Sequence, residues 1–403
     1  MKQKFLALFF LFFFLFSAIA SAFASPTQGL VRPNDLFFET IETTAPAGLT
    51  VDVPFAILMD AHTGTVIFEQ DADTQTQPAS VTKIMTILLA AEEIEAGRLQ
   101  LSDMVTTSAF AASMGGSQIF LEEGEQMTVE DMLKAVIISS ANDASVALAE
   151  HIAGTEEAFV ARMNERAQTL GMTNTIFINS TGLPGDGVDN LSTARDIALM
   201  SREAIGHDVV KEYAIIWMDT VRNGEFGLTN TNRLAYYFDG ATGLKTGFTQ
   251  EAMYCLSATA MRDGVEFIAV VLHGQSSDAR FEAAKTLLNY AFANYSLYDL
   301  QPEAVLPPMR VSLGQVDSVQ PVLQGENQIL LPKTALANIR QELILLEDLT
   351  APVTAGQNLG TLNVYEGETL IVTIEIVAAN EVEKVSIFGA FVNFLSLLLH
   401  GGL

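Results

Sequence analysis

The sequence predicts an α+β domain, built on an antiparallel sheet with a large helical insertion, then a small all-β domain and a C-terminal amphipathic helix. Three observations lead to this fold class. Strand patterns stand on both sides of a long stretch with helical periodicity. Pro302, Pro307 and Pro308 separate this part from a second one that is strand-like and punctuated by turns. A strongly apolar segment ends the chain. Strands that bracket helices in this order are typical of α+β proteins.

The N-terminal segment predicts a secretory signal over residues 1–24. Lys2 and Lys4 precede an apolar run from Phe5 to Phe16, and Ala22-Phe23-Ala24 provides a cleavage site of small residues. An uncleaved membrane anchor is the alternative interpretation, but the apolar run is short for a helix that spans a bilayer. We therefore expect secretion across an inner membrane.

The α+β domain is expected over residues 25–297. It begins with a hairpin whose strands, 54–58 and 65–69, flank a turn that ends at Gly64. After Pro78, apolar residues recur at three- and four-residue spacing, which predicts a helix. The remaining elements are helices over 129–153 (interrupted at Ser140), over 158–170 and from Ser192, strands over 245–248, 252–261 and 266–272, and a helix over 278–295.

The second domain is expected over residues 298–380, with strand patterns at 329–331, 342–346, 361–365 and 369–377. In the tail, residues 381–403, small or polar residues recur every three or four positions among Val, Ile, Phe and Leu. This pattern predicts an amphipathic helix with a wide apolar face. We expect it to lie on a membrane surface as an anchor, because so apolar a chain end needs a large apolar partner. A helix docked on its own domain is the alternative.

The charge balance bounds the choice of partner. The chain has 48 acidic and 21 basic residues, a formal net charge of −27. Such a surface repels phosphate backbones, so no nucleic-acid partner is expected, and a hold on anionic lipids must be mainly hydrophobic. Cys255 is the only cysteine, and the five histidines lack metal-ligand spacing, so we expect no disulfide, no metal and no cofactor.

Three short motifs follow one another along the α+β domain: Ser80-Val81-Thr82-Lys83, Ser140-Ala141-Asn142 and Lys245-Thr246-Gly247. Together they supply a hydroxyl nucleophile, an amine that can activate it, a proton relay, an amide that can hold a peptide and a cation for a carboxylate. Acyl transfer through a serine ester needs this set. Alone, each motif has an ordinary interpretation: a helix start, a turn or cap, and a surface strand.

The first motif places Ser80 and Lys83 three residues apart at a helix N-terminus, so both side chains leave one face. Lys83 can take the serine proton only if its amine is neutral, which requires burial or a neighbouring cation such as Lys245. Ser140 can pass a proton to the leaving amine, and Asn142 can hold a peptide backbone or orient Lys83.

The third motif lies on a predicted strand that can pair with an extended substrate. The Lys245 ammonium and the Thr246 hydroxyl suit a terminal carboxylate. Gly247 allows the substrate to approach the backbone closely.

At these residues the chain resembles the low-molecular-mass penicillin-binding proteins that act as D-alanyl-D-alanine carboxypeptidases. Their sequence pattern is matched beyond the motifs, at Pro78–Thr86, Ser140–Ala144, Ser192–Asp196, Gly243–Thr249 and Leu287–Tyr290. The resemblance implies a β-lactamase/transpeptidase-like domain, and it extends loosely to the all-β domain and the tail.

The resemblance also implies a role for each residue. Ser80 is expected to be the acylated nucleophile and Lys83 its base, with Ser140 and Asn142 as the second motif. Lys245 and Thr246 are expected to bind the terminal D-Ala carboxylate, and the backbone N–H groups of Ser80 and Phe248 to form the oxyanion hole. Close relatives often have His where this chain has Phe248, so we expect a changed substrate preference there and retained activity.

The function expected from these residues is a D-Ala-D-Ala carboxypeptidase that acts on peptidoglycan stem peptides and is acylated by β-lactams. It would lie in the periplasm, at the outer face of the cytoplasmic membrane. A class A-like β-lactamase is an alternative, but it needs a Glu in the loop from Phe177 to Leu191, which contains only Asp186 and Asp189 as acidic residues. Two further functions stay open: a D,D-endopeptidase and a non-catalytic scaffold that binds the cell wall.

Overall fold

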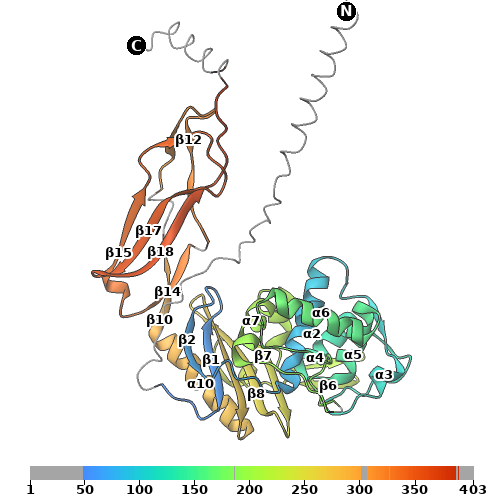
Figure 1. Ribbon diagram of the computed structural model, residues 1–403. Helices are drawn as coiled ribbons and strands as arrows, with labels where there is room; N and C mark the ends of the chain where they lie inside the picture. Colours follow the sequence, from blue (N-terminus) through green and yellow to red (C-terminus); the bar gives the residue numbers. More distant parts are fainter. Residues whose placement is uncertain (1–48, 186, 301–305, 326, 387–388, 390–403) are drawn as a thin grey trace, which may run out of the picture. The chain divides into compact units, whose positions relative to one another are not determined.

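The computed structural model describes residues 49–185, 187–300, 306–325, 327–386 and 389 (Figure 1). The predicted signal over 1–24 lies outside these residues. Of the terminal helix predicted over 381–403, residues 387–388 and 390–403 also lie outside them. Within the described part, no helix has both the length and the apolar character that crossing a membrane requires.

The α+β prediction is confirmed by a five-stranded antiparallel sheet in the order β2-β1-β9-β8-β7. Its strands are β1 (Phe55–Asp60), β2 (Val66–Gln70), β7 (Ala241–Thr249), β8 (Met253–Arg262) and β9 (Val265–Gly274). The two predicted hairpins, β1–β2 and β8–β9, are both present. The third motif therefore lies on β7, which is an edge strand.

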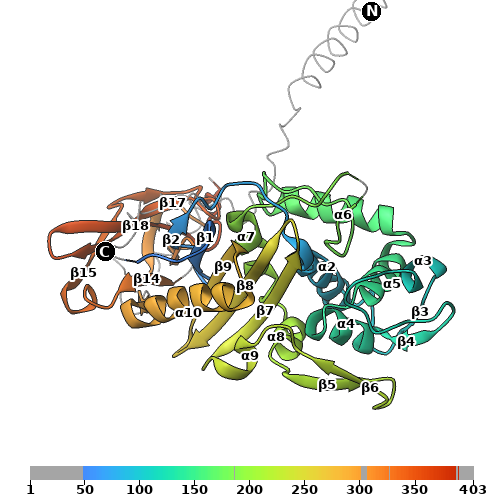
Figure 2. The same cartoon turned by 90° about the horizontal axis from the view of Figure 1, so that it is seen from below.

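Helices cover both faces of this sheet (Figure 2). Helix α10 (Ser277–Asn294) packs on one face through Phe281, Ala284, Leu287 and Leu288, whose spacing places them on one side of the helix. The helical insertion packs on the other face, where its apolar side chains form one continuous core with residues of β1 and β9.

The insertion contains short hairpins and helices between β2 and β7. Its elements are η1 (Ala79–Thr82), α2 (Lys83–Glu95), β3 (Met104–Thr106), α3 (Ala109–Ala112), β4 (Gln126–Thr128), α4 (Val129–Ile138), α5 (Asn142–Ala153), α6 (Glu156–Thr169), α7 (Ala194–Ala204), α8 (Asp208–Ala214), β5 (Met218–Val221), β6 (Phe226–Thr229) and α9 (Leu234–Tyr237). Threonine side chains cap α4, α6 and α7, where each hydroxyl accepts a hydrogen bond from a first-turn backbone N–H.

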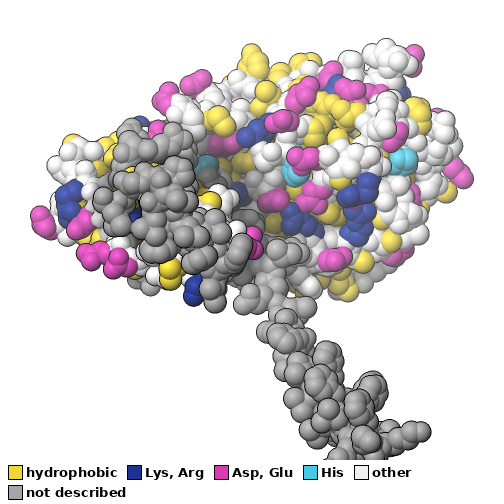
Figure 3. Space-filling model, turned by 90° about the horizontal axis from the view of Figure 1, so that it is seen from above, with side chains coloured by type: hydrophobic (Ala, Val, Ile, Leu, Met, Phe, Trp, Pro, Cys, Tyr) yellow, Lys and Arg dark blue, Asp and Glu magenta, His cyan; other side chains and the backbone are white. Residues whose placement is uncertain are grey.

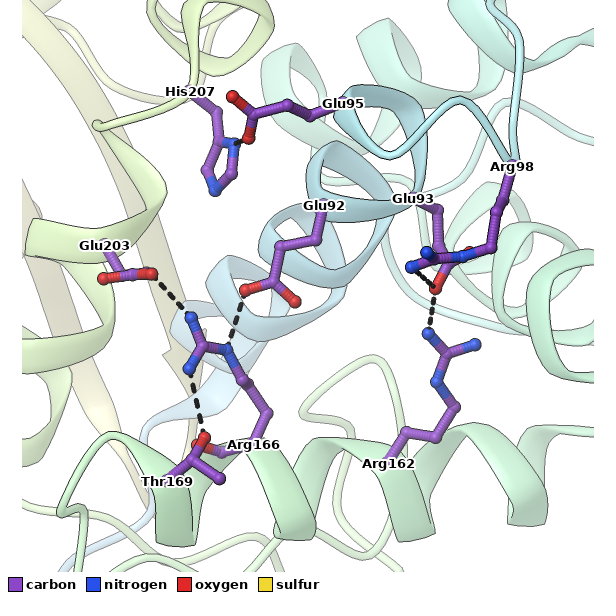
Figure 4. Close-up of polar contacts among 9 residues, drawn as sticks. All are labelled: Glu92, Glu93, Glu95, Arg98, Arg162, Arg166, Thr169, Glu203 and His207. Atoms are coloured by element: carbon purple, nitrogen blue, oxygen red, sulfur yellow. Dashed lines mark hydrogen bonds and ion pairs between the residues drawn. The ribbon is translucent and has the colours of Figure 1, made fainter. Parts of the chain in front are cut away.

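Helix α2 is buried along most of its length, and ion pairs fix its C-terminal end (Figure 4). Glu93 pairs with Arg98 at 2.6 Å and with Arg162 of α6. Arg166 of α6 bridges Glu92 at 2.7 Å and Glu203 of α7 at 2.6 Å. The helix that begins at Lys83 is thus held by apolar packing along its length and by charges at its far end.

After α10 the described chain is mostly strand. The elements are β10 (Tyr295–Asp299), β11 (Met309–Ser312), β12 (Ser318–Val319), β13 (Pro321–Leu323), β14 (Gln328–Pro332), η3 (Leu336–Asn338), β15 (Ile339–Leu345), β16 (Leu349–Thr350), β17 (Asn358–Glu366) and β18 (Thr369–Ala378). The largest sheet after α10 has the order β13-β18-β17-β15, and the apolar residues of this part of the chain form a separate core. Strand β10 spans the predicted boundary at 297/298 and pairs with β14.

Candidate active site

Ser80 lies in a single 3₁₀ turn, η1, and Lys83 is the first residue of α2. The sequence predicts that both lie at a helix N-terminus; the structure adds that the chain enters α2 through this tighter turn, where Ala79 adopts a left-handed backbone with φ of 48°. Lys83 Nζ lies 3.1 Å from Ser80 Oγ. The amine therefore contacts the hydroxyl that it would have to deprotonate.

The Lys83 side chain is fully buried, and its amine is surrounded by oxygen acceptors. Nζ donates to Asn142 Oδ1 and to the carbonyl of Thr181, both at 2.6 Å. Burial lowers the pKa of Lys83 well below its ordinary value, and the positive charge of Lys245 lowers it further, while Asp143 opposes this shift. A lowered pKa provides the neutral amine that a general base requires.

The second motif interrupts the helical stretch between α4 and α5, as predicted. Ser140 adopts a left-handed backbone with φ of 62°, and its buried Oγ has no hydrogen-bond partner among the described residues. Asn142 begins α5, and its amide bridges Lys83 and the carbonyl of Gly115, to which Nδ2 donates at 2.7 Å. A buried hydroxyl without a partner is available for a substrate group.

The third motif lines the open edge of the sheet. Lys245 is fully buried, and its Nζ donates to the carbonyl of Thr246 at 3.0 Å. Burial, followed by the charge of Arg280, lowers the pKa of Lys245 to about 7. The Thr246 hydroxyl donates to the Thr231 hydroxyl at 2.7 Å.

Two glycines pack directly against the nucleophile turn. A Cβ on Gly247 would lie 2.7 Å from the Pro78 carbonyl oxygen and 3.1 Å from the Ser80 nitrogen. A Cβ on Gly182, whose φ is 78°, would lie 1.9 Å from the Ala79 carbonyl oxygen. Only glycine allows the chain to pass this closely, so β7 and the loop after α6 both press on the residue that carries the hydroxyl.

Arg280 was missed by the sequence analysis. It lies in the first turn of α10 and is only 8% exposed, and its Nη1 donates to the carbonyl oxygens of Gly247 at 3.0 Å and Cys255 at 3.3 Å. Its Nε is buried without a partner in the described part of the chain, and burial lowers its pKa to about 10. The sequence did contain one sign of Arg280: its spacing from Ala284 and Leu287 places this basic residue on the apolar face of the predicted helix.

The loop from Phe177 to Leu191 closes the site behind Lys83. Asn179 Oδ1 accepts from the backbone N–H groups of Thr181 and Gly182, which turns the Thr181 carbonyl toward the lysine. Asn190 Nδ2 donates to the Thr82 hydroxyl at 3.0 Å and ties the loop to η1. A backbone carbonyl from this loop thus contacts the amine of Lys83.

Phe248 follows the third motif on β7, and the residue is 51% exposed. The ring stacks on Tyr254 with centroids 4.4 Å apart. Cys255 is the neighbour of Gly247 across the strands, and burial raises the pKa of its thiol to about 11. The cysteine is therefore an unreactive part of the core.

Comparison with known proteins shows the family to which the chain is related. A family model for D-alanyl-D-alanine carboxypeptidases matches residues 40–276, and one for the C-terminal domain of penicillin-binding protein 5 matches residues 303–384. The D-alanyl-D-alanine carboxypeptidase DacF of Bacillus subtilis is 37% identical, over 84% of this chain and 87% of its own. DacC of Escherichia coli, also named a D-alanyl-D-alanine carboxypeptidase, is 34% identical over 94% and 97%.

Solved structures give the same result. Penicillin-binding protein 5 from Haemophilus influenzae superposes with a TM-score of 0.75 at 28% identity, over 83% of this chain and 99% of its own. The D-alanyl-D-alanine carboxypeptidase DacD from Francisella tularensis superposes with a TM-score of 0.67 at 32% identity, over 85% and 96%. The chain therefore belongs to the D-alanyl-D-alanine carboxypeptidase family.

Proposed function

We propose that this protein is a serine-type D-Ala-D-Ala carboxypeptidase, which removes the terminal D-Ala from peptidoglycan stem pentapeptides through an acyl-enzyme on Ser80. The observation that carries this proposal is a fully buried Lys83 amine 3.1 Å from Ser80 Oγ. A buried amine with a strongly lowered pKa is neutral at a pH where an exposed lysine is charged. It can therefore act as the base for the serine.

In the first step Ser80 Oγ attacks the carbonyl of the penultimate D-Ala while Lys83 takes the hydroxyl proton. The backbone N–H groups of Ser80 and Phe248 stabilise the oxyanion, because Gly247 brings β7 against the Ser80 turn. Ser140 Oγ passes the proton to the departing amine, and D-Ala leaves. Water then attacks the ester, Lys83 again accepts the proton, and the tetrapeptide is released with Ser80 regenerated.

The terminal carboxylate is bound by Lys245, Thr246 and Arg280. Two cations and a hydroxyl lie at this edge of the sheet, and the Arg280 Nε has a free proton to donate. The substrate pairs with β7 as an added antiparallel strand. With its carboxylate at Thr246 and its scissile carbonyl at Phe248, the peptide continues past Thr249 into a hollow that Ala79, Gly182 and Leu183 also line.

Acylation by β-lactams follows from the same chemistry, and two of the solved relatives are named as penicillin-binding proteins. A class A-like β-lactamase is the less favoured function, because the loop from Phe177 to Leu191 supplies no glutamate to activate the deacylating water. A D,D-endopeptidase would use the same residues on a cross-linked peptide.

The location is proposed from the sequence. The signal over residues 1–24 directs export, and the tail over 381–403 attaches the enzyme to the outer face of the cytoplasmic membrane. In this arrangement the catalytic domain, 25–297, and the β domain, 298–380, lie in the periplasm.

The deciding experiment measures D-Ala release from a synthetic pentapeptide, together with the intact mass after exposure to penicillin. The active protein should release D-Ala and gain one penicillin mass on the peptide that contains Ser80, and Ser80→Ala should lose both. If the unmodified protein releases no D-Ala and gains no mass, the function is wrong and a wall-binding scaffold is favoured. Rapid turnover of the penicillin would instead identify a β-lactamase.

A further inference from the structure

The segment from Met114 to Leu121 crosses the N-terminal end of α5 and has no regular secondary structure. Asp143 accepts hydrogen bonds on one side of it, from the backbone N–H of Leu121 at 3.0 Å and from that of Ile119. Between these residues Phe120 has a left-handed backbone with φ of 58°, and the residue is 65% exposed. A conformation of this kind persists only where neighbours hold it.

Arg222 holds the same segment from its other side. It lies in the turn of the β5–β6 hairpin, with its side chain 21% exposed. Its Nη1 donates to the Ile119 carbonyl at 2.7 Å and its Nη2 to the Phe120 carbonyl at 3.1 Å. Its Nε pairs with Glu125 at 2.6 Å, and its guanidinium lies 5.4 Å from the ring of Phe226. One planar group thus fixes both carbonyls and is itself fixed.

The held segment supports Asn142 through its own carbonyl groups. The Ser117 carbonyl accepts from the Asn142 backbone N–H at 2.7 Å, and the Gly115 carbonyl accepts from Asn142 Nδ2 at 2.7 Å. Gly116 lies so close that a Cβ there would be 2.9 Å from Nδ2. The other end of the same amide, Oδ1, accepts from Lys83 at 2.6 Å. The orientation of the amide therefore depends on where residues 115–117 lie.

We propose that Arg222 is a positioning residue for the acylation step. It acts from the β5–β6 hairpin, through Ile119, Phe120 and the segment they belong to, on the Asn142 amide that orients the Lys83 amine. The proposal rests on the function proposed above, in which Lys83 is the base for Ser80. Arg222 does not contact the reacting atoms; it sets the place of the groups that do.

The test variant is Arg222→Met, which keeps a long side chain against Phe226 and removes every donor. We expect the rate of Ser80 acylation by a fluorescent penicillin, and kcat for D-Ala release, to fall about ten- to a hundredfold, because small misplacements of catalytic groups cost that much. Amide hydrogen exchange of the peptide covering residues 113–125 should become faster, while peptides from β8 and β9 keep their exchange rates. Arg222→Lys should restore part of the acylation rate.

The matched control is Arg195→Met. Arg195 also pairs with two carboxylates, Glu69 and Asp73, and among the described residues its side chain hydrogen-bonds to these two alone. Its loss should leave both the acylation rate and the exchange of 113–125 unchanged. Glu125→Gln keeps both carbonyl contacts of Arg222 and should change the acylation rate by less than about threefold.

Three outcomes would overturn the positioning role. In the first, the Arg222→Met variant is acylated at the rate of the unmodified protein. In the second, the variant is acylated more slowly, but amide hydrogen exchange over residues 113–125 is no faster. In the third, the Arg195→Met variant is acylated as slowly as the Arg222→Met variant. If the Arg222→Met variant does not fold, the same comparison is made with the Arg222→Lys variant. The positioning role would also be overturned if that variant kept both the acylation rate and the amide hydrogen exchange of the unmodified protein. Failure of the proposed function is distinct, because then the unmodified protein itself would neither be acylated nor release D-Ala.

Discussion

At the residue scale, the site is defined by two lysines whose amines lie in the protein interior. Burial is the largest cause of the lowered pKa of both Lys83 and Lys245, and each lies near another cation. Such an arrangement is unfavourable for folding, because the unfolded chain would bind protons that the folded chain excludes. Groups placed at a cost in stability are typical of catalytic sites.

This cost predicts the effect of Lys245→Met. The pKa of Lys245 falls from an ordinary value of 10.5 to about 7 on folding, so stability is lost as the pH falls from 10.5 to 7 and stays constant below. The variant should therefore gain free energy of unfolding, roughly 3 to 5 kcal/mol at pH 7 and much less at pH 10, while KM for the pentapeptide rises. Urea unfolding at both pH values measures this. An equal gain at both would contradict the assigned pKa.

Individual residues also show where sequence reasoning ends. The structure brings Ser80, Lys83, Asn142 and Lys245 together, as their motifs predicted. These residues could be found because the residue types in the three motifs match the groups that the reaction needs. Arg280 and Arg222 could not be found in this way. Each is a single basic residue that holds the site through hydrogen bonds to backbone carbonyl groups, and backbone partners leave no pattern in the sequence. The catalytic roles themselves stay predictions until they are tested.

At the scale of the elements, α2 connects the nucleophile to the rest of the helical region. Its N-terminal residue is Lys83, and its C-terminal end carries Glu92, Glu93 and Glu95 (Figure 4). Glu93 is the most buried of these, with a side chain 10% exposed. Hydrogen bonds from Arg98, followed by those from Arg162, lower its pKa below the ordinary 4.5 against the opposing effect of burial.

We therefore expect Glu93→Gln to lower the free energy of unfolding by about 1 to 2 kcal/mol at neutral pH. A carboxyl with a lowered pKa stabilises the fold above its ordinary value, and this contribution is lost as the pH falls through the folded pKa. The difference between the variant and the unmodified protein should thus shrink below about pH 4. Glu92→Gln, with a more exposed pair, is the control and should cost less. A pH-independent difference would contradict the ion pair as the cause.

Long, strongly patterned elements could be predicted, whereas short ones could not. The strands β8 and β9, the helix α10 and the break between α4 and α5 follow from hydrophobic periodicity and from turn residues. The hairpins β3–β4 and β5–β6 have strands of three or four residues, too short to show alternation. Their packing is decided by distant residues such as Arg222, which sequence periodicity does not report.

At the scale of the whole molecule, charge is the dominant feature. The formal net charge is −27, and on the face shown in Figure 3 the acidic side chains are scattered among basic ones. A surplus of one sign favours solubility and opposes compactness through mutual repulsion. In the tail proposed as an anchor, residues 385–403 contain no Asp, Glu, Lys or Arg, so this part would bind a membrane through apolar contact.

The surplus predicts a salt dependence of stability. Raising sodium chloride from about 10 mM to about 150 mM shortens the Debye length from about 30 Å to about 8 Å, which screens long-range repulsion more than close ion pairs. The thermal unfolding midpoint should therefore rise by several degrees. Potassium chloride at the same ionic strength serves as the control and should act equally. A midpoint that falls with salt would show that attractive pairs dominate.

The two glycines that press on the Ser80 turn bear on antibiotic resistance. An enzyme can escape a drug by enlarging a residue beside its nucleophile, but any side chain at Gly182 or Gly247 would collide with the backbone of that turn. A substitution at either glycine would move Ser80 away from the peptide substrate as well as from the β-lactam. Resistant forms of this enzyme should therefore change at more distant positions, where the route of the drug can differ from that of the peptide.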